Sequence, residues 1–349
     1  MAEPFFSLSK NDQAGLIGMH AKVLKMQPFI VEKDIWVCWA LDKLFRMPER
    51  LDMAFKGGTS LSKVYNAIDR FSEDIDVTID YRGFVKPTTG KETRSELSRL
   101  TETLKAELPK YANAIIKPYF ESELAKEFHG KEWKVDLESN GERLFIHYPS
   151  AIESSGYMES NVLLEFGARN VAEPLETHTV KTYIAEQAKD ISFPEAKVAV
   201  LALSRTYWEK ATLAHVEYHR TEQRTSANRW SRHWYDLNQL SGDLDQICAE
   251  KSRDILNQVV KHKKDFFHHS FANYDDCIGG GLRLVPKADF QKLLAEDFES
   301  MIKAGMFYKE PPKFDVILER LQKVEDAINE SQKPKLKENT QRSPGTSKK

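Results

Sequence analysis

The chain has 349 residues, 41% of them hydrophobic, and its length allows one large domain or two ordinary domains around a substantial core. No stretch reaches the roughly 18 consecutive apolar residues of a membrane span, and the N-terminal segment lacks the basic and apolar regions of a secretory signal, so we expect a cytoplasmic protein. The formal net charge of −2 excludes a polycation that attracts nucleic acid through its overall charge.

The first two hundred residues alternate between strand-like runs and helical patterns. Apolar or alternating runs predict strands at 51–55, 75–79, 133–138, 143–148 and 161–166. Residues 30–45 have apolar side chains at helical spacing, and residues 59–68 predict a helix that starts with Thr59 as a capping residue. This alternation predicts an α+β domain over residues 1–200, including N-terminal helices.

After Pro194 the pattern changes to long, charged, amphipathic segments. They predict helices at 206–220, 228–241, 249–263, 287–304 and 312–330. Residues 194–204 fit either a last strand or a first helix, and we place a helical domain over residues 201–330. Residues 331–349 are basic and nearly without apolar side chains, so they cannot bury enough surface to offset their ordering entropy, and we expect a disordered tail.

A strand, two glycines, a helix and a second strand follow one another between Phe55 and Asp80. Side chains alternate along a strand, so Asp74 and Asp76 project from the same side, about 7 Å apart. Two like charges at this distance are unfavourable unless a cation neutralises them. A pair of Mg²⁺ ions would do so, with Mn²⁺ as the alternative ion, and two-metal sites serve in-line phosphoryl transfer.

Gly57 and Gly58 add the second half of this argument. Without a Cβ atom, they allow backbone N–H groups at the start of a helix to approach a triphosphate. The loop has no lysine that would make it a P-loop, and a lone Gly-Gly pair or D-x-D is a weak signal. The conjunction of the two predicts a cleft in which phosphates and metal ions meet.

The segments 56–60 (KGGTS) and 70–76 (RFSEDID) resemble the signature of the AbiEii/AbiGii family of bacterial nucleotidyltransferase toxins. Residues 31–34 (VEKD) resemble a helix of that family, and residues 208–213 (WEKATL) and 231–237 (SRHWYDL) match its later motifs in order and spacing. The resemblance implies a polymerase-β-like nucleotidyltransferase core with a C-terminal helical lobe.

The resemblance also implies the roles of individual residues. Those expected to bind the nucleotide are Gly57, Gly58, Thr59, Ser72 and Lys210. It further implies that Asp74 and Asp76 hold the metal ions, and that Lys210 and Asp236 are the lysine and aspartate of the two later motifs.

Lys210 and Asp236 each have a second interpretation. A lysine is able to reach a β- or γ-phosphate and to stabilise the leaving pyrophosphate, or it is a solvated lysine beside Glu209. Asp236 follows Arg229 and Arg232 by seven and four residues, on one helical face. It either orients Lys210 or the nucleotide, or forms a weak surface pair with Arg232. The resemblance favours the functional role for Lys210 and Asp236 and leaves both arginines open between phosphate binding and ion pairing.

A third carboxylate is expected to take the proton from the attacking hydroxyl. Glu165 is the first choice, because a carboxylate within the apolar run VLLEF needs a partner or a task. Asp136 and Glu138 are its competitors.

Residues 205–233 contain six Lys/Arg and only three acidic residues, interleaved with Trp208, Tyr218 and Trp230, and they predict a phosphate-facing surface. The histidines have no metal-binding spacing. The cysteines have neither metal nor disulfide spacing, and we interpret them as reduced thiols: Cys38, Cys248 and Cys277.

Together these features predict metal-dependent transfer of a nucleoside monophosphate from an NTP to an acceptor hydroxyl. Family analogy implies the 3′ end of tRNA as this acceptor, a role in a toxin–antitoxin or phage-defence system, and a cognate antitoxin protein as partner. Two alternatives stay open, an enzyme that modifies protein hydroxyls and a non-catalytic module that binds a nucleotide or a partner. A broken D-x-D or a missing lysine would indicate the module, and the sequence has neither defect.

Overall fold

The computed structural model describes residues 2–152, 160–222 and 224–333. The disordered tail predicted from residue 331 was wrong for residues 331–332, which are helical, and from 334 onward it lies outside the described residues. The α-helices are α1 (Lys10–Leu24), α2 (Pro28–Arg46), α3 (Gly57–Lys63), α4 (Arg94–Tyr111), α5 (Lys117–Glu127), α6 (Leu203–His219), α7 (Ser231–Leu240), α8 (Leu244–Cys248), α9 (Glu250–Phe266), α10 (Ala288–Lys303) and α11 (Phe314–Gln332). The strands are β1 (Glu3–Pro4), β2 (Met53–Lys56), β3 (Ile75–Asp80), β4 (Lys134–Leu137), β5 (Arg143–His147), β6 (Asn161–Asn170), β7 (Leu175–Lys181), β8 (Ile191–Ser192) and β9 (Glu195–Leu201).

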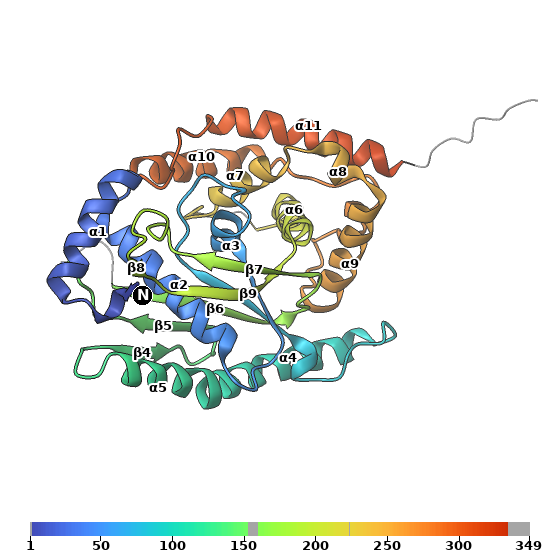
Figure 1. The fold of residues 1–349 in the computed structure, drawn as a ribbon. Coiled ribbons are helices and arrows are strands. Elements are labelled where there is room, and N and C mark those ends of the chain that lie inside the picture. Colours follow the sequence, from blue (N-terminus) through green and yellow to red (C-terminus); the bar gives the residue numbers. More distant parts are fainter. Residues whose placement is uncertain (1, 153–159, 223, 334–349) are drawn as a thin grey trace, which may run out of the picture.

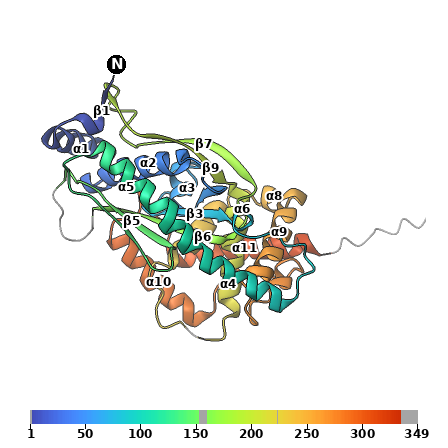
Figure 2. The same cartoon turned by 90° about the horizontal axis from the view of Figure 1, so that it is seen from below.

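A mixed seven-stranded sheet of order β4-β5-β6-β3-β2-β9-β7 forms the centre of the molecule. β3 pairs in parallel with β6 and β2 with β9, whereas the other neighbouring strands are antiparallel. Figure 1 shows α4 and α5 below this sheet and α10 and α11 above it, and Figure 2 shows α4 and α5 from below. Strands and helices thus form a layered α+β protein, which confirms the predicted fold class.

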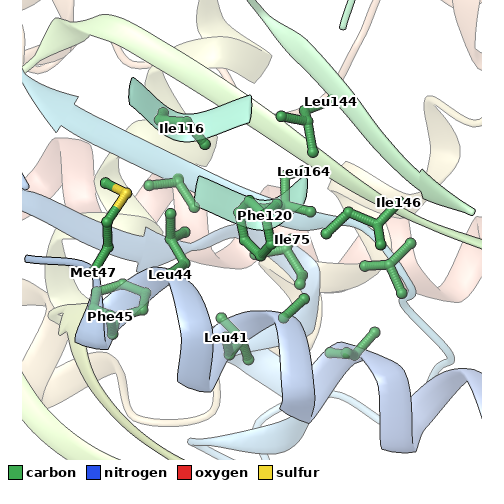
Figure 3. Packing of buried hydrophobic residues seen from close by; sticks show 14 of the residues in the cluster. Leu41, Leu44, Phe45, Met47, Ile75, Ile116, Phe120, Leu144, Ile146 and Leu164 are labelled. Carbon is green, nitrogen blue, oxygen red and sulfur yellow. The ribbon is translucent and has the colours of Figure 1, made fainter. Parts of the chain in front are cut away.

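One face of the sheet is apolar because the odd positions of β3 are Ile75, Val77 and Ile79, all fully buried. Helix α2 and the segment that includes α5 cover this face, as the close view in Figure 3 shows for Leu41 and Phe120. Truncating one such buried side chain to alanine costs about 2–5 kcal/mol. Since side chains alternate along a strand, the burial of this face turns Asp76 toward the opposite one.

The helices after β9 pack around a second apolar cluster, which contains the fully buried Trp208, Trp234 and Tyr235. Helix α3, which follows β2, adds Leu61 to this cluster. The sheet and the helical lobe are therefore joined at the glycine-containing helix. The five helices predicted after Pro194 correspond to α6, α7, α9, α10 and α11.

Two local expectations are decided by the structure. Residues 194–204 contain both alternatives, because β9 ends at Leu201 and α6 begins at Leu203. The helix predicted over 59–68 was wrong in its bounds, since α3 begins at Gly57 and ends at Lys63. Thr59 does not cap it, because the Thr59 hydroxyl donates to the Asp74 carbonyl at 2.6 Å instead.

Two further observations concern the expected absences. No helix among the described residues is long and apolar enough to cross a membrane. The three cysteines are free of disulfide bonds.

Candidate active site

Four charged side chains form a row across the middle of the sheet. Asp76 on β3 is the register neighbour of Glu165 on β6 and of Lys56 on β2. Glu165 in turn lies opposite Arg143 on β5, whose Nε donates to its Oε1 at 2.8 Å. Adjacent strands are about 4.8 Å apart, so the two carboxylates lie side by side between two cations.

The Asp76 carboxylate lacks direct compensation. Burial and the nearby carboxylates of Glu165 and Asp74 together raise its pKa to about 6, because the positive charges of Lys56 and Arg232 offset these effects only in part. No hydrogen bond or ion pair to this carboxylate is found within the part of the chain that the structure describes. Asp76 is therefore a site that a cation would stabilise.

The two glycines allow α3 to begin directly against the acidic strand. Gly57 has a φ of 76°, and a Cβ atom there would overlap the Asp76 carboxylate. A Cβ on Gly58 would lie 2.6 Å from Ser72 Oγ and 2.7 Å from Arg70 Nη2. A side chain at either position would therefore collide with neighbouring residues. This is a second reason for the two glycines, besides the access of phosphate to the backbone that the sequence predicts.

Thr59 and Ser72 hold the start of β3. The buried Thr59 hydroxyl lies 3.0 Å from Ser72 Oγ, in addition to its bond to the Asp74 carbonyl. This arrangement fixes the backbone just before Asp76. Ser72 faces the cleft, whereas the Thr59 hydroxyl is already used within the protein.

The family-like segment VEKD supports the same loop from outside. Lys33 Nζ donates to Glu73 Oε2 at 2.6 Å, one residue before Asp74. Asp34 forms a buried ion pair with Lys63 of α3 and accepts a hydrogen bond from the Tyr183 backbone N–H at 2.7 Å. The segment therefore positions α3 and the strand that carries the aspartates.

Asp236 is fully buried and neutralised by two cations. Arg70 donates to both of its oxygens, at 2.7 and 2.8 Å, and Lys210 Nζ lies 2.9 Å from Oδ2. Burial alone would raise the pKa of Asp236, but Arg70 and Lys210 outweigh this effect and hold the pKa well below its usual range. The alternative Arg232–Asp236 surface pair is wrong, because Arg70 from the β3 side satisfies Asp236.

The interpretation of Lys210 as a solvated lysine beside Glu209 is also wrong. The Lys210 side chain is only 11% exposed, and Glu209 contacts Lys56 at 3.7 Å and Arg205 at 3.3 Å instead. Burial opposes ionisation of Glu209, yet Lys56, Lys263 and Arg205 lower its pKa to about 2.

Arg229 and Arg232 face Asp74 and not Asp236. Arg229 Nη2 lies 3.8 Å and Arg232 Nη1 4.0 Å from Asp74 Oδ2. The shared helical face was wrong for Arg229, which precedes α7 and has a φ of 59°. Burial, together with Arg70 and Arg229, lowers the pKa of Arg232.

These groups surround one cleft of about 220 Å³ between the sheet and the helical lobe. It brings together Gly57, Gly58, Ser72, Asp74, Asp76 and Lys210. Asp236 lies behind Lys210, and Glu165 lies one strand beyond Asp76. The cleft thus has an acidic wall on β3 and a basic wall on the helices.

Sequence reasoning assigned no role to several cleft residues. Lys56 and Arg70 belong to the segments that resemble the family motifs. Both residues therefore carried a sequence signal, but the sequence did not indicate their partners. His233 lies 3.5 Å from Lys210 Nζ, and burial, with Lys210 and Arg232 nearby, lowers its pKa well below the usual value. Lys263, on α9, had no sequence signal beyond a helical pattern. Burial, together with the nearby positive charges of Lys56 and Arg205, lowers the pKa of Lys263 to about 8. The negative charge of Glu209 raises this pKa and offsets these effects only in part.

The three candidates for the third carboxylate occupy different places. Glu165 is the one beside Asp76. Asp136 lies on the edge strand β4, where it contacts Lys134 at 2.7 Å and His147 at 3.2 Å. Glu138 follows the same strand and contacts Arg143 at 4.0 Å. Because β4 is separated from β6 by β5, Asp136 and Glu138 lie away from the cleft.

The donor set of the acidic wall suits a hard divalent cation, because it offers carboxylate oxygens and an uncompensated negative charge. Among the described residues, no group of three or more His, Cys, Asp or Glu side chains lies close enough to hold a metal ion. Protein ligands would therefore be few, as is usual for Mg²⁺ that also binds substrate phosphates.

A family model described as nucleotidyl transferase AbiEii toxin, type IV toxin–antitoxin system, matches residues 39–320. The chain belongs to this family. AbiEii membership makes it a nucleotidyltransferase toxin of a type IV toxin–antitoxin system, with NTP as substrate and an antitoxin as the other member of the system.

No curated protein matches the chain. Among solved structures, the chain is similar to MenT4, a nucleotidyltransferase toxin from Mycobacterium tuberculosis H37Rv, at 17% identity and a TM-score of 0.43. This similarity covers 93% of the chain and 100% of MenT4.

Proposed function

We propose that this AbiEii-family chain transfers a nucleoside monophosphate from an NTP to the 3′-terminal hydroxyl of an RNA, with tRNA as the first candidate. The observation that carries the proposal is the cleft with two opposed walls. Asp74 and Asp76 line one wall, and the cation Lys210, held by Asp236, lines the other. A triphosphate and its counter-ions need both walls in one cavity.

On the basic wall, Lys210 would contact the β- or γ-phosphate. Its ammonium group faces the cleft while Asp236 fixes its direction, and Arg70 fixes Asp236 in turn. A positioned cation stabilises the charge that develops on the departing pyrophosphate. The N–H groups of Gly57 and Gly58 would hold the same phosphates at the start of α3.

On the acidic wall, Asp74 and Asp76 would hold the Mg²⁺ ions, two in number, with Mn²⁺ as a substitute. When bound, such ions neutralise the triphosphate and polarise its oxygens. Asp76 must be deprotonated for this role, so its raised pKa sets a lower pH limit for metal binding. Arg229 and Arg232 restrain Asp74 from the lobe side.

Glu165 would take the proton from the attacking hydroxyl. It lies beside Asp76 on the neighbouring strand β6, and its side chain retains an exposed fraction of 29%. Arg143 orients the carboxylate through one hydrogen bond, which leaves its other oxygen available to accept a proton.

The test is incubation of the full chain with total tRNA and each α-labelled NTP in turn, with Mg²⁺ and with EDTA. We expect label on tRNA only with Mg²⁺, and none on tRNA whose 3′ diol has been destroyed by periodate. Label on lysate protein instead of tRNA would support the enzyme that modifies protein. NTP binding without any transfer would support the non-catalytic module.

A further inference from the structure

A second cavity, also of about 220 Å³, adjoins the cleft and has no part in the proposed chemistry. The two cavities share Leu213 and Lys263 as lining residues, so they meet at α6 and α9. The second cavity is lined by aromatic and basic side chains, among them Arg220, Arg224, Trp230 and Phe267.

The aromatic rings of this cavity are paired with cations. The Arg224 guanidinium lies 3.7 Å from the centroid of the Trp230 ring, and Lys263 Nζ lies 4.3 Å from that of Phe267. Glu217 accepts two hydrogen bonds from each of Arg220 and Arg224, at 2.7–3.0 Å. These contacts fix the planar groups before any ligand binds.

The charge of the cavity decides between two ligands. Three cations, Arg220, Arg224 and Lys263, face a single acidic residue, Glu217, so the lining carries excess positive charge. A pocket for the base of the NTP needs no such excess, because its triphosphate lies in the cleft. A nucleic-acid strand brings both a flat base and a phosphate with every nucleotide, and it matches an aromatic and basic lining.

We propose that this second cavity binds the terminal nucleotides of a single-stranded RNA acceptor, with a base stacked on Trp230 and a backbone phosphate at Lys263. This inference rests on the proposed function, since it takes the acceptor to be RNA. Lys263 stands at the junction, so the strand enters the cleft past Leu213. Of the aromatic residues in the phosphate-facing surface expected over residues 205–233, Trp208 is fully buried and cannot contact the strand.

The test is binding of a fluorescein-labelled single-stranded RNA of about six nucleotides to the full chain, by fluorescence anisotropy over a series of salt concentrations. Trp230→Ala is expected to weaken binding about tenfold or more without changing the salt dependence, and Trp230→Phe to retain most of the affinity. Lys263→Ala is expected to reduce the slope of log Kd against log salt by about 0.7, the value for one phosphate contact in a single strand.

Lys251→Ala is the matched control, because Lys251 lies on the same helix but lines a different cavity. If Trp230→Ala and Lys263→Ala bind the RNA as well as this control does, the inference is wrong. It is equally wrong if Trp230→Ala raises KM for the NTP and leaves RNA binding intact, or if the wild-type chain binds no RNA. Should Trp230→Ala not fold, Lys263→Ala and its salt slope still decide the outcome.

The Asp74→Ala variant separates this inference from the proposed function. It should bind the RNA as the wild-type chain does while transferring no label. If tRNA is labelled but binding is insensitive to Trp230 and Lys263, only the inference fails. If binding depends on both residues but no RNA is labelled, the proposed function fails and the second cavity remains a nucleic-acid site without transfer.

Discussion

Two carboxylates on opposite sides of the cleft, Asp76 in the acidic wall and Asp236 behind Lys210, have opposite electrostatic states. Asp76, on the sheet, has a pKa raised to about 6 and no direct partner among the described residues. Asp236, on α7, is bound by Arg70 and Lys210, and its pKa lies well below the usual range. The difference lies in the partners, because two cations bind the buried Asp236 directly, whereas the partly buried Asp76 lines the cleft beside two other carboxylates.

This contrast indicates that the two carboxylates have different roles. The negative charge of Asp236 is already used inside the protein, where it fixes the cation Lys210 toward the cleft. The charge of Asp76 has no direct partner among the described residues, so the carboxylate is unfavourable by itself and would be stabilised by a cation. Substitutions on the two walls should therefore separate activity from stability in different ways.

The largest effect is expected from removing the acidic wall. Asp74→Ala and Asp76→Ala should each reduce transfer at least about a thousandfold, roughly 4 kcal/mol of lost transition-state stabilisation, and leave the fold intact. Labelled-NTP transfer and thermal unfolding measure the two quantities. Near-normal activity with Mg²⁺ in either variant would refute the metal assignment.

Removing Asp236 should act on stability as well as activity. Asp236→Ala leaves the Arg70 guanidinium buried without its partner, so we expect the free energy of unfolding to fall by about 3–5 kcal/mol. Denaturant unfolding measures this change. Asp275→Ala removes an exposed partner of Lys264 and serves as control, with a change of no more than about 0.5 kcal/mol. Equal stabilities of the two variants would show that the buried ion pair between Arg70 and Asp236 does not stabilise the fold.

Lys210→Ala should reduce kcat/KM at least about a hundredfold, roughly 2.7 kcal/mol. Asp236 keeps Arg70 as a partner, so stability should change less than in Asp236→Ala. Lys210→Arg should rescue only part of the activity, because a planar guanidinium presents its donors differently. The double variant of Lys210→Ala and Asp236→Ala should be little less active than either single variant. Fully additive losses of activity would show that Asp236 does not act through Lys210.

The smallest effect concerns the pH dependence of stability without divalent cations. The folded-state pKa of Asp76 is about 6 and lies above its unfolded value, so the folded state binds more protons between these values. The contribution of Asp76 to the unfolding free energy should therefore fall as the pH rises from about 4 to 6, by on the order of 1 kcal/mol. Asp76→Asn should remove this component, and identical pH profiles for wild type and variant would show that Asp76 is adequately compensated.

The sequence by itself determined the local part of the site. Strand alternation placed Asp74 and Asp76 on one side, and the two glycines marked the point where backbone comes close to a neighbouring group. The change from strands to amphipathic helices after Pro194 likewise depends only on residues near one another in the chain. Such features follow from short-range geometry, which the residue pattern encodes directly.

Only the tertiary structure decided the partners. Arg70 and Asp236 are 166 positions apart, and no local pattern distinguishes this pair from the Arg232–Asp236 spacing within one helix. Glu165 became the register neighbour of Asp76 through the parallel pairing of β6 with β3. Lys263 reached the junction of the two cavities through the packing of α9 on α6. Charges at such separations in the chain meet only when the sheet and the lobe bury their apolar faces, because that burial sets which side chains are desolvated together.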